Sequence, residues 1–309
     1  MPSTAPRTSD FGPVPPALTV AVLGPGGVGG LLAALLSRAG CRVICIAGEA
    51  TAGALRHDGI RVHSAQFGDF TATVEADTVL REPVDLCLVT VKQTALDAAL
   101  VRTPPHLLDG GVVLPLLNGI EHVSTLRAHY GAERVMPGVI RVESTRTAPG
   151  IIEHGSPFLE IDLAATASPE AVARVAALLD AAGATTRVVG DESAVLWGKL
   201  AFLAPFALLT TRYRLPIGAI RSERREELTA LVAETSAVIR AVGGPGDAAQ
   251  VLSRYDAFPA GSKSSMLRDA EAGRPLELDA IGGALLRAAE QLGIQVPLMT
   301  RLVSELKGD

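Results

Sequence analysis

Thr19-Val-Ala-Val-Leu-Gly-Pro-Gly-Gly-Val-Gly29 decides the fold, because a short β-branched run stops at glycines and a helix-forming run follows. That helical run, residues 31–39, ends at Gly40, a residue type favoured just past a helix C-terminus. The order of strand, glycine turn and helix makes one β-α step. Three more apolar runs alternate with helical or loop stretches, at 42–46, 84–91 and 111–116. Such alternation predicts a parallel sheet covered on both faces.

Beyond these strands the pattern changes. Strand-like stretches at 62–74 and 134–163 are expected to extend the sheet or to add hairpins at its edge. A helix starting at Ser168-Pro-Glu and a strand at 185–189 then close the first domain. The remainder reads as helical, at 194–211, 224–242, 248–258 and 276–292. We therefore predict a flexible tail at 1–17, an α/β domain at 18–190 and an all-helical domain at 191–309.

The composition narrows the class of protein. With 309 residues, 48% hydrophobic and 20% charged, the chain is long enough for two cores and too apolar for intrinsic disorder. Lys plus Arg number 28 against 33 Asp plus Glu, and no basic cluster occurs, so nucleic acid is a poor candidate partner. Cys41, Cys45 and Cys87 lie in apolar runs without metal-ligand spacing. We expect no metal site and a reducing, cytoplasmic compartment.

An uncharged run of twenty residues, 17–36, is long enough to span a bilayer or to resemble a signal peptide. Its centre holds residues that would break a spanning helix, namely Gly24, Pro25, Gly26, Gly27, Gly29 and Gly30. We therefore interpret the run as strand, turn and helix, and expect no membrane association.

Gly24-Pro-Gly26-Gly27-Val28-Gly29 matches the pattern G-x-G-x-x-G between a strand and a helix. In that context the glycines permit a tight turn, close approach of the backbone to a pyrophosphate and close helix-strand packing. The segment predicts a Rossmann-type dinucleotide-binding domain, and a glycine-rich turn that binds nothing is the alternative. Glu49 follows the second strand. It either binds a ribose 2′-hydroxyl, which would favour NAD, or is a loop carboxylate exposed to solvent.

Polar residues follow the next two strands. Lys92 comes directly after the run at 84–91, and Asn118 follows the run at 111–116. Because ligands of open α/β sheets bind at the carboxyl ends of the strands, these two side chains can converge on one ligand. A lysine with its charge in solvent and a turn-forming Asn-Gly are the alternatives.

Lys199 lies in a helix that is otherwise apolar on every face. A lysine there is either extended to solvent or buried against a partner, and a desolvated lysine has a lowered pKa that suits acid-base work. Glu277 begins another predicted helix and is a candidate partner. A purely structural buried ion pair is the alternative.

Seven motifs in order resemble those of the ketopantoate reductase (2-dehydropantoate 2-reductase) family, within the 6-phosphogluconate-dehydrogenase-like group. They are Gly24-x-Gly26-x-x-Gly29, Val-Lys92, Asn118-Gly, Ala-Pro-Gly-Ile-Ile-Glu-His-Gly at 148–155, Leu-Trp-x-Lys199-Leu, Ser264-Ser265-Met-Leu-x-Asp269 and Glu277-Leu-Asp. The resemblance covers the chain from about Thr19 to Leu306.

The resemblance implies NADPH-dependent reduction of a 2-oxo acid to a 2-hydroxy acid, ketopantoate to pantoate or a less polar analogue, in pantothenate biosynthesis. Lys199 would be the general acid and Glu277 would orient it. Lys199, Ser265 and Asn118 would bind the substrate, and Lys92, Asn118 and Glu277 would border the cofactor. The partners implied are the small-molecule substrate and a second copy of the chain in a homodimer.

Two departures from the family pattern modify these expectations. Gly48 stands where the family commonly has an arginine that reads the 2′-phosphate of NADP, so NAD is not excluded. Leu203, Ala207 and Ile217 stand where the family has asparagines that bind ketopantoate. Loss of three amides predicts a less polar substrate, because each substrate group left unpaired costs about 1 to 3 kcal/mol.

Two other functions stay open from the sequence. The same fold and lysine serve a reductase of another electrophile, such as a 3-oxo acid, an imine or an amino-acid adduct. A non-catalytic dinucleotide-sensing module is the third reading, against which a buried Lys199 and Glu277 pair argues. Among the histidines, His122 follows Asn118 by four residues; it is expected on the surface of a helix, and a position facing the cleft is the alternative.

Overall fold

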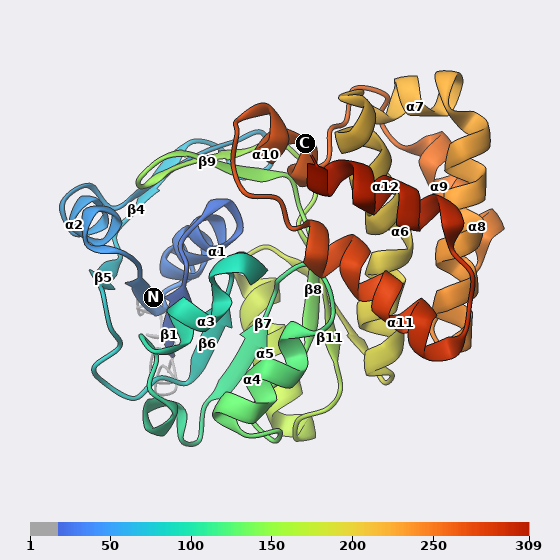
Figure 1. Ribbon diagram of the computed structural model, residues 1–309. Helices are drawn as coiled ribbons and strands as arrows, with labels where there is room; N and C mark the ends of the chain where they lie inside the picture. Colours follow the sequence, from blue (N-terminus) through green and yellow to red (C-terminus); the bar gives the residue numbers. More distant parts are fainter. Residues whose placement is uncertain (1–17, 309) are drawn as a thin grey trace, which may run out of the picture.

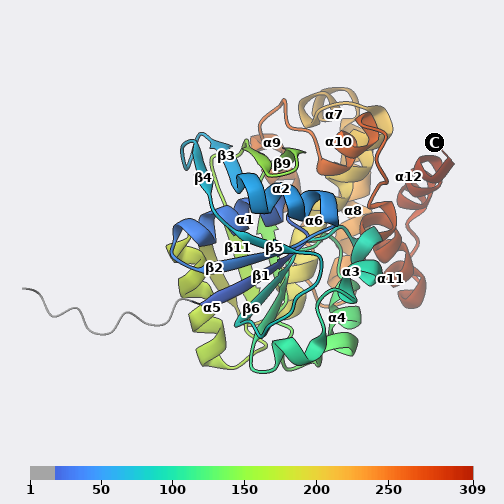
Figure 2. The ribbon, with the colours of Figure 1, turned by 90° about the vertical axis from the view of Figure 1, so that its left-hand side faces the viewer.

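The computed structural model describes residues 18–308, so the predicted tail at 1–17 lies outside the described residues. A parallel five-stranded sheet forms the centre of the first domain, in the order β5-β2-β1-β6-β7 (Figures 1 and 2). Its strands are β1 (Thr19–Leu23), β2 (Arg42–Ile46), β5 (Glu75–Asp77), β6 (Leu86–Val89) and β7 (Val112–Pro115). β1 and β2 have the predicted bounds, while β6 and β7 are shorter. Cys45 and Cys87 are buried within this sheet, and Cys41 is partly buried just before β2.

Helix α1 (Gly27–Arg38) is enclosed between two sheets. The second sheet has the order β4-β3-β10-β9, with β3 (Ile60–Ser64), β4 (Phe70–Ala72), β9 (Ser144–Ala148) and β10 (Ile151–His154). These strands do not extend the first sheet: β3 with β4 and β9 with β10 are antiparallel pairs, close to the expected hairpins, but they form a sheet of their own. Every residue of α1 from Gly29 to Leu36 is buried because the helix has sheet on two sides, and this burial explains the uncharged run in the sequence.

A third, three-stranded sheet follows, in the order β12-β11-β8, with β8 (Gly138–Arg141), β11 (Glu160–Ala164) and β12 (Thr185–Val189). Helix α5 (Pro169–Ala181) packs on it and begins as predicted, since the Ser168 hydroxyl accepts a 3.2 Å bond from the N–H of Ala171. The other elements of this half are α2 (Glu49–Asp58), η1 (Gln93–Ala95), α3 (Leu96–Leu100), η2 (Pro105–Leu108) and α4 (His122–Tyr130).

All described elements after β12 are helical (Figure 1). α6 (Glu192–Tyr213) is the central helix, and the others pack around it or around α8. They are α7 (Ile217–Glu223), α8 (Arg225–Ala241), α9 (Ala248–Ala257), α10 (Ser265–Glu271), the π-helical turn η3 (Asp279–Gly283), α11 (Ala284–Leu292) and α12 (Pro297–Gly308). By length and composition α6 is apolar enough to cross a membrane, but 67% of its apolar window is buried inside this helical core. Its apolar character is that of a core helix.

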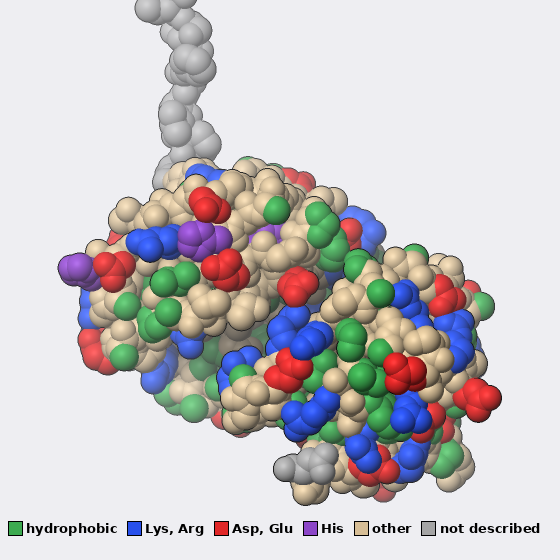
Figure 3. Space-filling view, turned by 90° about the horizontal axis from the view of Figure 1, so that it is seen from above, with side chains coloured by type: hydrophobic (Ala, Val, Ile, Leu, Met, Phe, Trp, Pro, Cys, Tyr) green, Lys and Arg blue, Asp and Glu red, His purple; other side chains and the backbone are tan. Residues whose placement is uncertain are grey.

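The carboxyl ends of β1, β6 and β7 point toward the helical domain, so Gly24, Lys92 and Asn118 lie at the edge that faces it. Figure 3 shows the two domains as two lobes with a hollow between them, and Lys and Arg side chains gather at its rim. The fold therefore places the predicted site residues at the junction of the domains.

Candidate active site

The glycine turn combines packing constraints with one position that the protein leaves open. Gly24 has φ +88°, and a Cβ there would lie 2.5 Å from Val91 Cγ1. A Cβ on Gly29 would lie 2.2 Å from Thr90 Oγ1. Around Gly26, however, the nearest atom to an added Cβ is a carbonyl oxygen 3.9 Å away. Protein packing does not explain this glycine, whereas close approach of a ligand phosphate to the backbone does.

Gly27 and Val28 form the first turn of α1. A Cβ on Gly27 would lie 2.3 Å from the carbonyl oxygen of Ser144, so β9 requires glycine there. Val28 is partly buried and packs against the core. The first N–H groups of a helix have no helical acceptor, and the residues present therefore fit the pyrophosphate of a dinucleotide.

Glu277 connects the two domains just before η3 and is 7% exposed. Its Oε2 accepts a 3.0 Å hydrogen bond from Asn118 Nδ2, and its Oε1 accepts a 3.2 Å bond from the N–H of Gln93. Gly119 allows this contact, because it has φ +84° and a Cβ there would lie 2.5 Å from the carbonyl oxygen of Ala280. The structure thus brings Asn118 and Glu277 together.

Lys199 is partly buried in α6, and its Nζ makes no hydrogen bond or ion pair within residues 18–308. Burial lowers its pKa to about 8, the charge of Glu277 raises it in part, and Arg141 lowers it. The expected ion pair between Lys199 and Glu277 is not formed, and the carboxylate oxygens of Glu277 accept from Asn118 and Gln93 instead. With a pKa near 8, Lys199 is mostly protonated at neutral pH and able to donate a proton.

Lys92 lies at the predicted sheet edge, but its partner is a residue of the helical domain. Its Nζ donates a 2.7 Å hydrogen bond to Asp269 Oδ2 in α10. Asp269 is buried, and its Oδ1 accepts a 2.8 Å bond from Arg274 Nε. This three-residue network is a second connection between the domains.

The two adjacent serines have different environments. Ser264 is buried and caps α10: its hydroxyl accepts a 3.0 Å bond from the N–H of Leu267 and lies 2.8 Å from Thr210 Oγ1. Ser265 is exposed, and its hydroxyl has no hydrogen bond within the described part of the chain. The hydroxyl available to a ligand is therefore that of Ser265.

The three apolar replacements do not share one environment. Ala207 and Ile217 are 0% exposed in the core of the helical domain, and only Leu203 is partly buried. The prediction that all three lie against the substrate is therefore wrong for Ala207 and Ile217. Of the three replacements, only Leu203 is placed to favour a less polar substrate.

At the end of β2, Glu49 is exposed in the first turn of α2 and forms a 2.8 Å ion pair with Arg56. An exposed carboxylate at this position is compatible with both predicted roles, a contact with the ribose and a solvated loop carboxylate. Gly48, which precedes it, is exposed, and a Cβ there would contact no atom within 4 Å.

His122 was expected on the surface and is instead 1% exposed. Burial and the nearby charge of Lys199 lower its pKa to about 4. The spacing of four residues from Asn118 was the only available signal for the alternative that His122 faces the cleft. The burial itself depends on tertiary packing, which the local sequence does not reveal.

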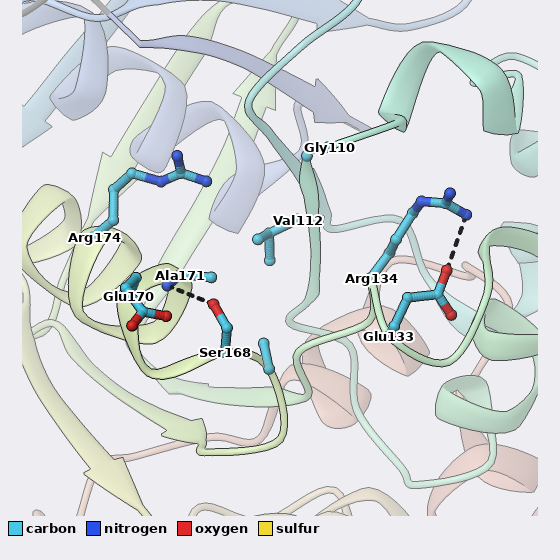
Figure 4. Close-up of a pocket in the computed structure, with 10 residues that line it drawn as sticks. Gly110, Val112, Glu133, Arg134, Ser168, Glu170, Ala171 and Arg174 are labelled. Atoms are coloured by element: carbon cyan, nitrogen blue, oxygen red, sulfur yellow. Dashed lines mark hydrogen bonds and ion pairs between the residues drawn. The ribbon is translucent and has the colours of Figure 1, made fainter.

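An open pocket of about 470 Å³ lies at the opposite edge of the parallel sheet, where β7 begins (Figure 4). Three of its polar residues are engaged with the protein: Arg134 pairs with Glu133 at 3.2 Å and with Asp109 at 3.0 Å, and Ser168 caps α5. None of the predicted site residues lines it.

A glycine turn at the carboxyl edge of a parallel sheet, facing a helical domain that supplies a lysine of lowered pKa, defines a two-domain dinucleotide-dependent oxidoreductase. Family comparison agrees: "Ketopantoate reductase PanE/ApbA" matches residues 20–166, and the C-terminal part of that family matches residues 192–308. The chain belongs to the ketopantoate reductase family. The predicted resemblance is therefore confirmed.

Individual relatives share nearly the whole length. The 2-dehydropantoate 2-reductase of Mycobacterium tuberculosis is 31% identical over 294 residues, which cover 92% of this chain and 95% of that protein. The crystal structure of 2-dehydropantoate 2-reductase from Geobacter metallireducens has a TM-score of 0.86 at 29% identity and covers 94% of this chain and 99% of its own. A D-mandelate dehydrogenase with NADH and anilino(oxo)acetate has a TM-score of 0.87 at 19% identity, with 94% and 98% covered, which shows the shared fold alone.

Proposed function

We propose that this protein reduces a 2-oxo acid to a 2-hydroxy acid with NADPH, ketopantoate being the first substrate to test. The observation that carries the proposal is Lys199, a partly buried lysine with a lowered pKa and without a protein partner among the described residues. It lies in the domain that faces the glycine turn. The family and the names of the relatives support the same reaction.

In the proposed reaction, the bound nicotinamide supplies hydride to the carbonyl carbon. The ammonium of Lys199 donates its proton to the carbonyl oxygen, which becomes the hydroxyl, and the neutral amine regains a proton from solvent. The same positive charge stabilises the negative charge that develops on the oxygen. Glu277 keeps the lysine protonated near neutral pH, since its charge raises the pKa that burial lowers.

The other predicted residues receive complementary roles in this proposal. Residues 18–190 bind the nucleotide, with its pyrophosphate on the glycine turn, and residues 191–309 supply the acid. Asn118 borders the nicotinamide ribose and the reacting centre, held there by Glu277. Ser265 donates its free hydroxyl to the substrate carboxylate. Lys92 contributes positive charge at the same edge once a nucleotide competes with Asp269 for it.

The preference for NADPH has one supporting observation. Glu49 is the first carboxylate after β2 in the sequence, and its ion pair with Arg56 reduces the repulsion that a 2′-phosphate would meet. The absence of an arginine at Gly48 keeps NADH as the second cofactor to test.

The deciding experiment follows the loss of nicotinamide absorbance with NADPH and with NADH against a panel of 2-oxo acids that includes ketopantoate. Lys199→Ala is expected to abolish turnover while nucleotide binding persists. Lys307→Ala, which changes an exposed lysine in α12, is the matched control and should retain full activity. Turnover by Lys199→Ala at the wild-type rate would refute the assigned acid. Faster turnover of apolar 2-oxo acids than of ketopantoate would support the prediction of a less polar substrate, which is based on Leu203.

A further inference from the structure

His122, the first residue of α4, is buried without the hydrogen bonds that its ring requires. Both ring nitrogens are enclosed and have no partner in the part of the chain that the structure describes. A neutral imidazole has one N–H donor and one acceptor nitrogen, so two polar atoms lose the bonds they make in water. Buried polar groups are nearly always paired, and this exception needs a specific explanation.

Lys199 is the charged group that acts on His122. Its charge and burial together lower the pKa of the imidazole to about 4, so His122 is neutral at physiological pH. The two helices that carry these residues are joined directly, because Arg127 in α4 donates a 3.0 Å hydrogen bond to Glu192 in α6. Apolar residues of both helices also belong to one core cluster.

The segment just before His122 is fixed from the helical domain. Glu121 accepts two hydrogen bonds from Arg287, at 2.8 Å and 2.6 Å. Asn118 donates to Glu277 at 3.0 Å. Because both contacts hold the backbone that leads into α4, the position of the His122 ring relative to α6 is defined by this segment as well as by the helix.

Lys199 and His122 could satisfy each other's missing hydrogen bonds. The ammonium has donors without an acceptor, and the neutral ring has an acceptor nitrogen without a donor. We propose that His122 is a positioning residue: in solution, with or without substrate, the side chain of Lys199 turns to its unprotonated ring nitrogen, which accepts a hydrogen bond and fixes the direction in which the lysine offers its proton. This inference rests on the proposed function, in which Lys199 is the general acid. Glu277 and Arg141 are the other charged groups that act on that lysine.

Two variants separate this role from simple packing. His122→Leu removes the acceptor but keeps a side chain suited to burial, and His122→Gln supplies an amide oxygen as a replacement acceptor. We expect His122→Leu to lower kcat about tenfold or more with the KM for nucleotide unchanged, and His122→Gln to restore part of the loss. His57→Leu, at an exposed histidine near the end of α2, is the matched control and should change neither constant.

A second measurement needs no substrate. The chain has four lysines, so the pH dependence of Lys199 acylation can be resolved by peptide mass spectrometry. Loss of a neutral acceptor destabilises the ammonium, and we expect His122→Leu to lower the pKa of Lys199 by about half a unit or more, with His122→Gln close to wild type. If His122→Leu does not fold, His122→Met replaces it with the same expectation.

The outcomes are distinct. A Lys199 pKa and a kcat that are both unchanged in the apolar variant would overturn the inference, as would a rise in that pKa, which would mean that the ring carries a charge. If the wild-type protein reduces no 2-oxo acid, the proposed function fails on its own. The shift in the Lys199 pKa then still decides whether His122 holds the lysine.

Discussion

Asn118 at the end of a Rossmann strand donates its amide to Glu277 of the helical domain over 3.0 Å, and Lys199 remains without a partner in residues 18–308. Glu277 therefore acts on the lysine by its charge and on the other domain by its hydrogen bonds. The site depends on both domains being in contact, since neither contains all three groups.

Glu277→Gln removes the charge while keeping the size of the side chain. Without that charge, the pKa of Lys199 should fall below about 8, and less of the lysine is protonated at neutral pH. We expect kcat to fall roughly tenfold or more and the alkaline limb of its pH profile to move to lower pH. Initial rates between pH 6 and 10 measure both effects, and an unmoved alkaline limb would contradict the assigned role. Glu271→Gln, an exposed carboxylate in α10, is the control.

Alanine at Gly26 and alanine at Gly29 should both weaken nucleotide binding but should differ in their effect on the melting temperature. A Cβ on Gly29 would meet Thr90 Oγ1 at 2.2 Å, so Gly29→Ala should lower the melting temperature as well as nucleotide affinity. Gly26→Ala has free space and should leave the melting temperature near wild type while it weakens NADPH binding, because the methyl group occupies the side from which the phosphate approaches. Thermal unfolding and calorimetric titration test both. Tight NADPH binding by Gly26→Ala would place the pyrophosphate elsewhere.

Asp269 holds two cations, Lys92 and Arg274, with its side chain 8% exposed. Asp269→Ala leaves both without this partner, and we expect the free energy of unfolding to fall by about 1 to 3 kcal/mol. Glu271→Ala, which removes an exposed ion pair with Lys263, should cost no more than about 1 kcal/mol. Urea denaturation compares the two variants, and equal losses would show that the Asp269 network contributes no more than a surface pair.

Protonation of His122 should destabilise the fold in acid. Its pKa is about 4 in the folded protein, against 6.5 for a histidine in free contact with water, so the fold favours the neutral ring. That contribution is fully present above pH 6.5 and is lost as the pH falls toward 4, up to roughly 3 kcal/mol in total. His154, also buried with a lowered pKa, adds a loss of the same sign. Denaturation at pH 7 and pH 5 should show a smaller difference in His122→Leu than in wild type, and an equal difference would contradict this.

Gly48→Arg tests the cofactor preference. The site has room for the side chain, since a Cβ at Gly48 contacts nothing within 4 Å. An arginine there is positioned to pair with a 2′-phosphate, and we expect the ratio of NADPH to NADH affinity to rise by about tenfold. Competitive titration of the two nucleotides measures the ratio. An unchanged ratio would mean that the 2′ position is bound away from the end of β2.

The sequence predicted where individual strands begin and end better than it predicted which strands pair with one another. β1, β2 and β12 have the predicted bounds because short apolar runs between turn residues define a strand locally. The parallel pairing of β3 with β10 joins residues about ninety positions apart, and no local pattern reveals it. The second sheet was missed for that reason.

The site shows the same division. Lys199, Asn118 and Glu277 were predicted from residue type and position, but their contacts were not. Charge complementarity suggested an ion pair between Lys199 and Glu277, whereas the observed partner of Glu277 is an amide. The burial of His122 was missed because it depends on tertiary packing that the local sequence does not reveal.

The enclosure of α1 between two sheets also determines which part of the molecule is free to move. A helix packed between two sheets has little freedom to tilt. The glycine turn at its start therefore gives the nucleotide a fixed binding surface. Opening and closing around substrate would then be a movement of the helical domain, limited by the packing of α6 on β8, β11 and β12. In such a movement Lys199 would approach the bound nicotinamide, while the position of the nicotinamide would remain fixed.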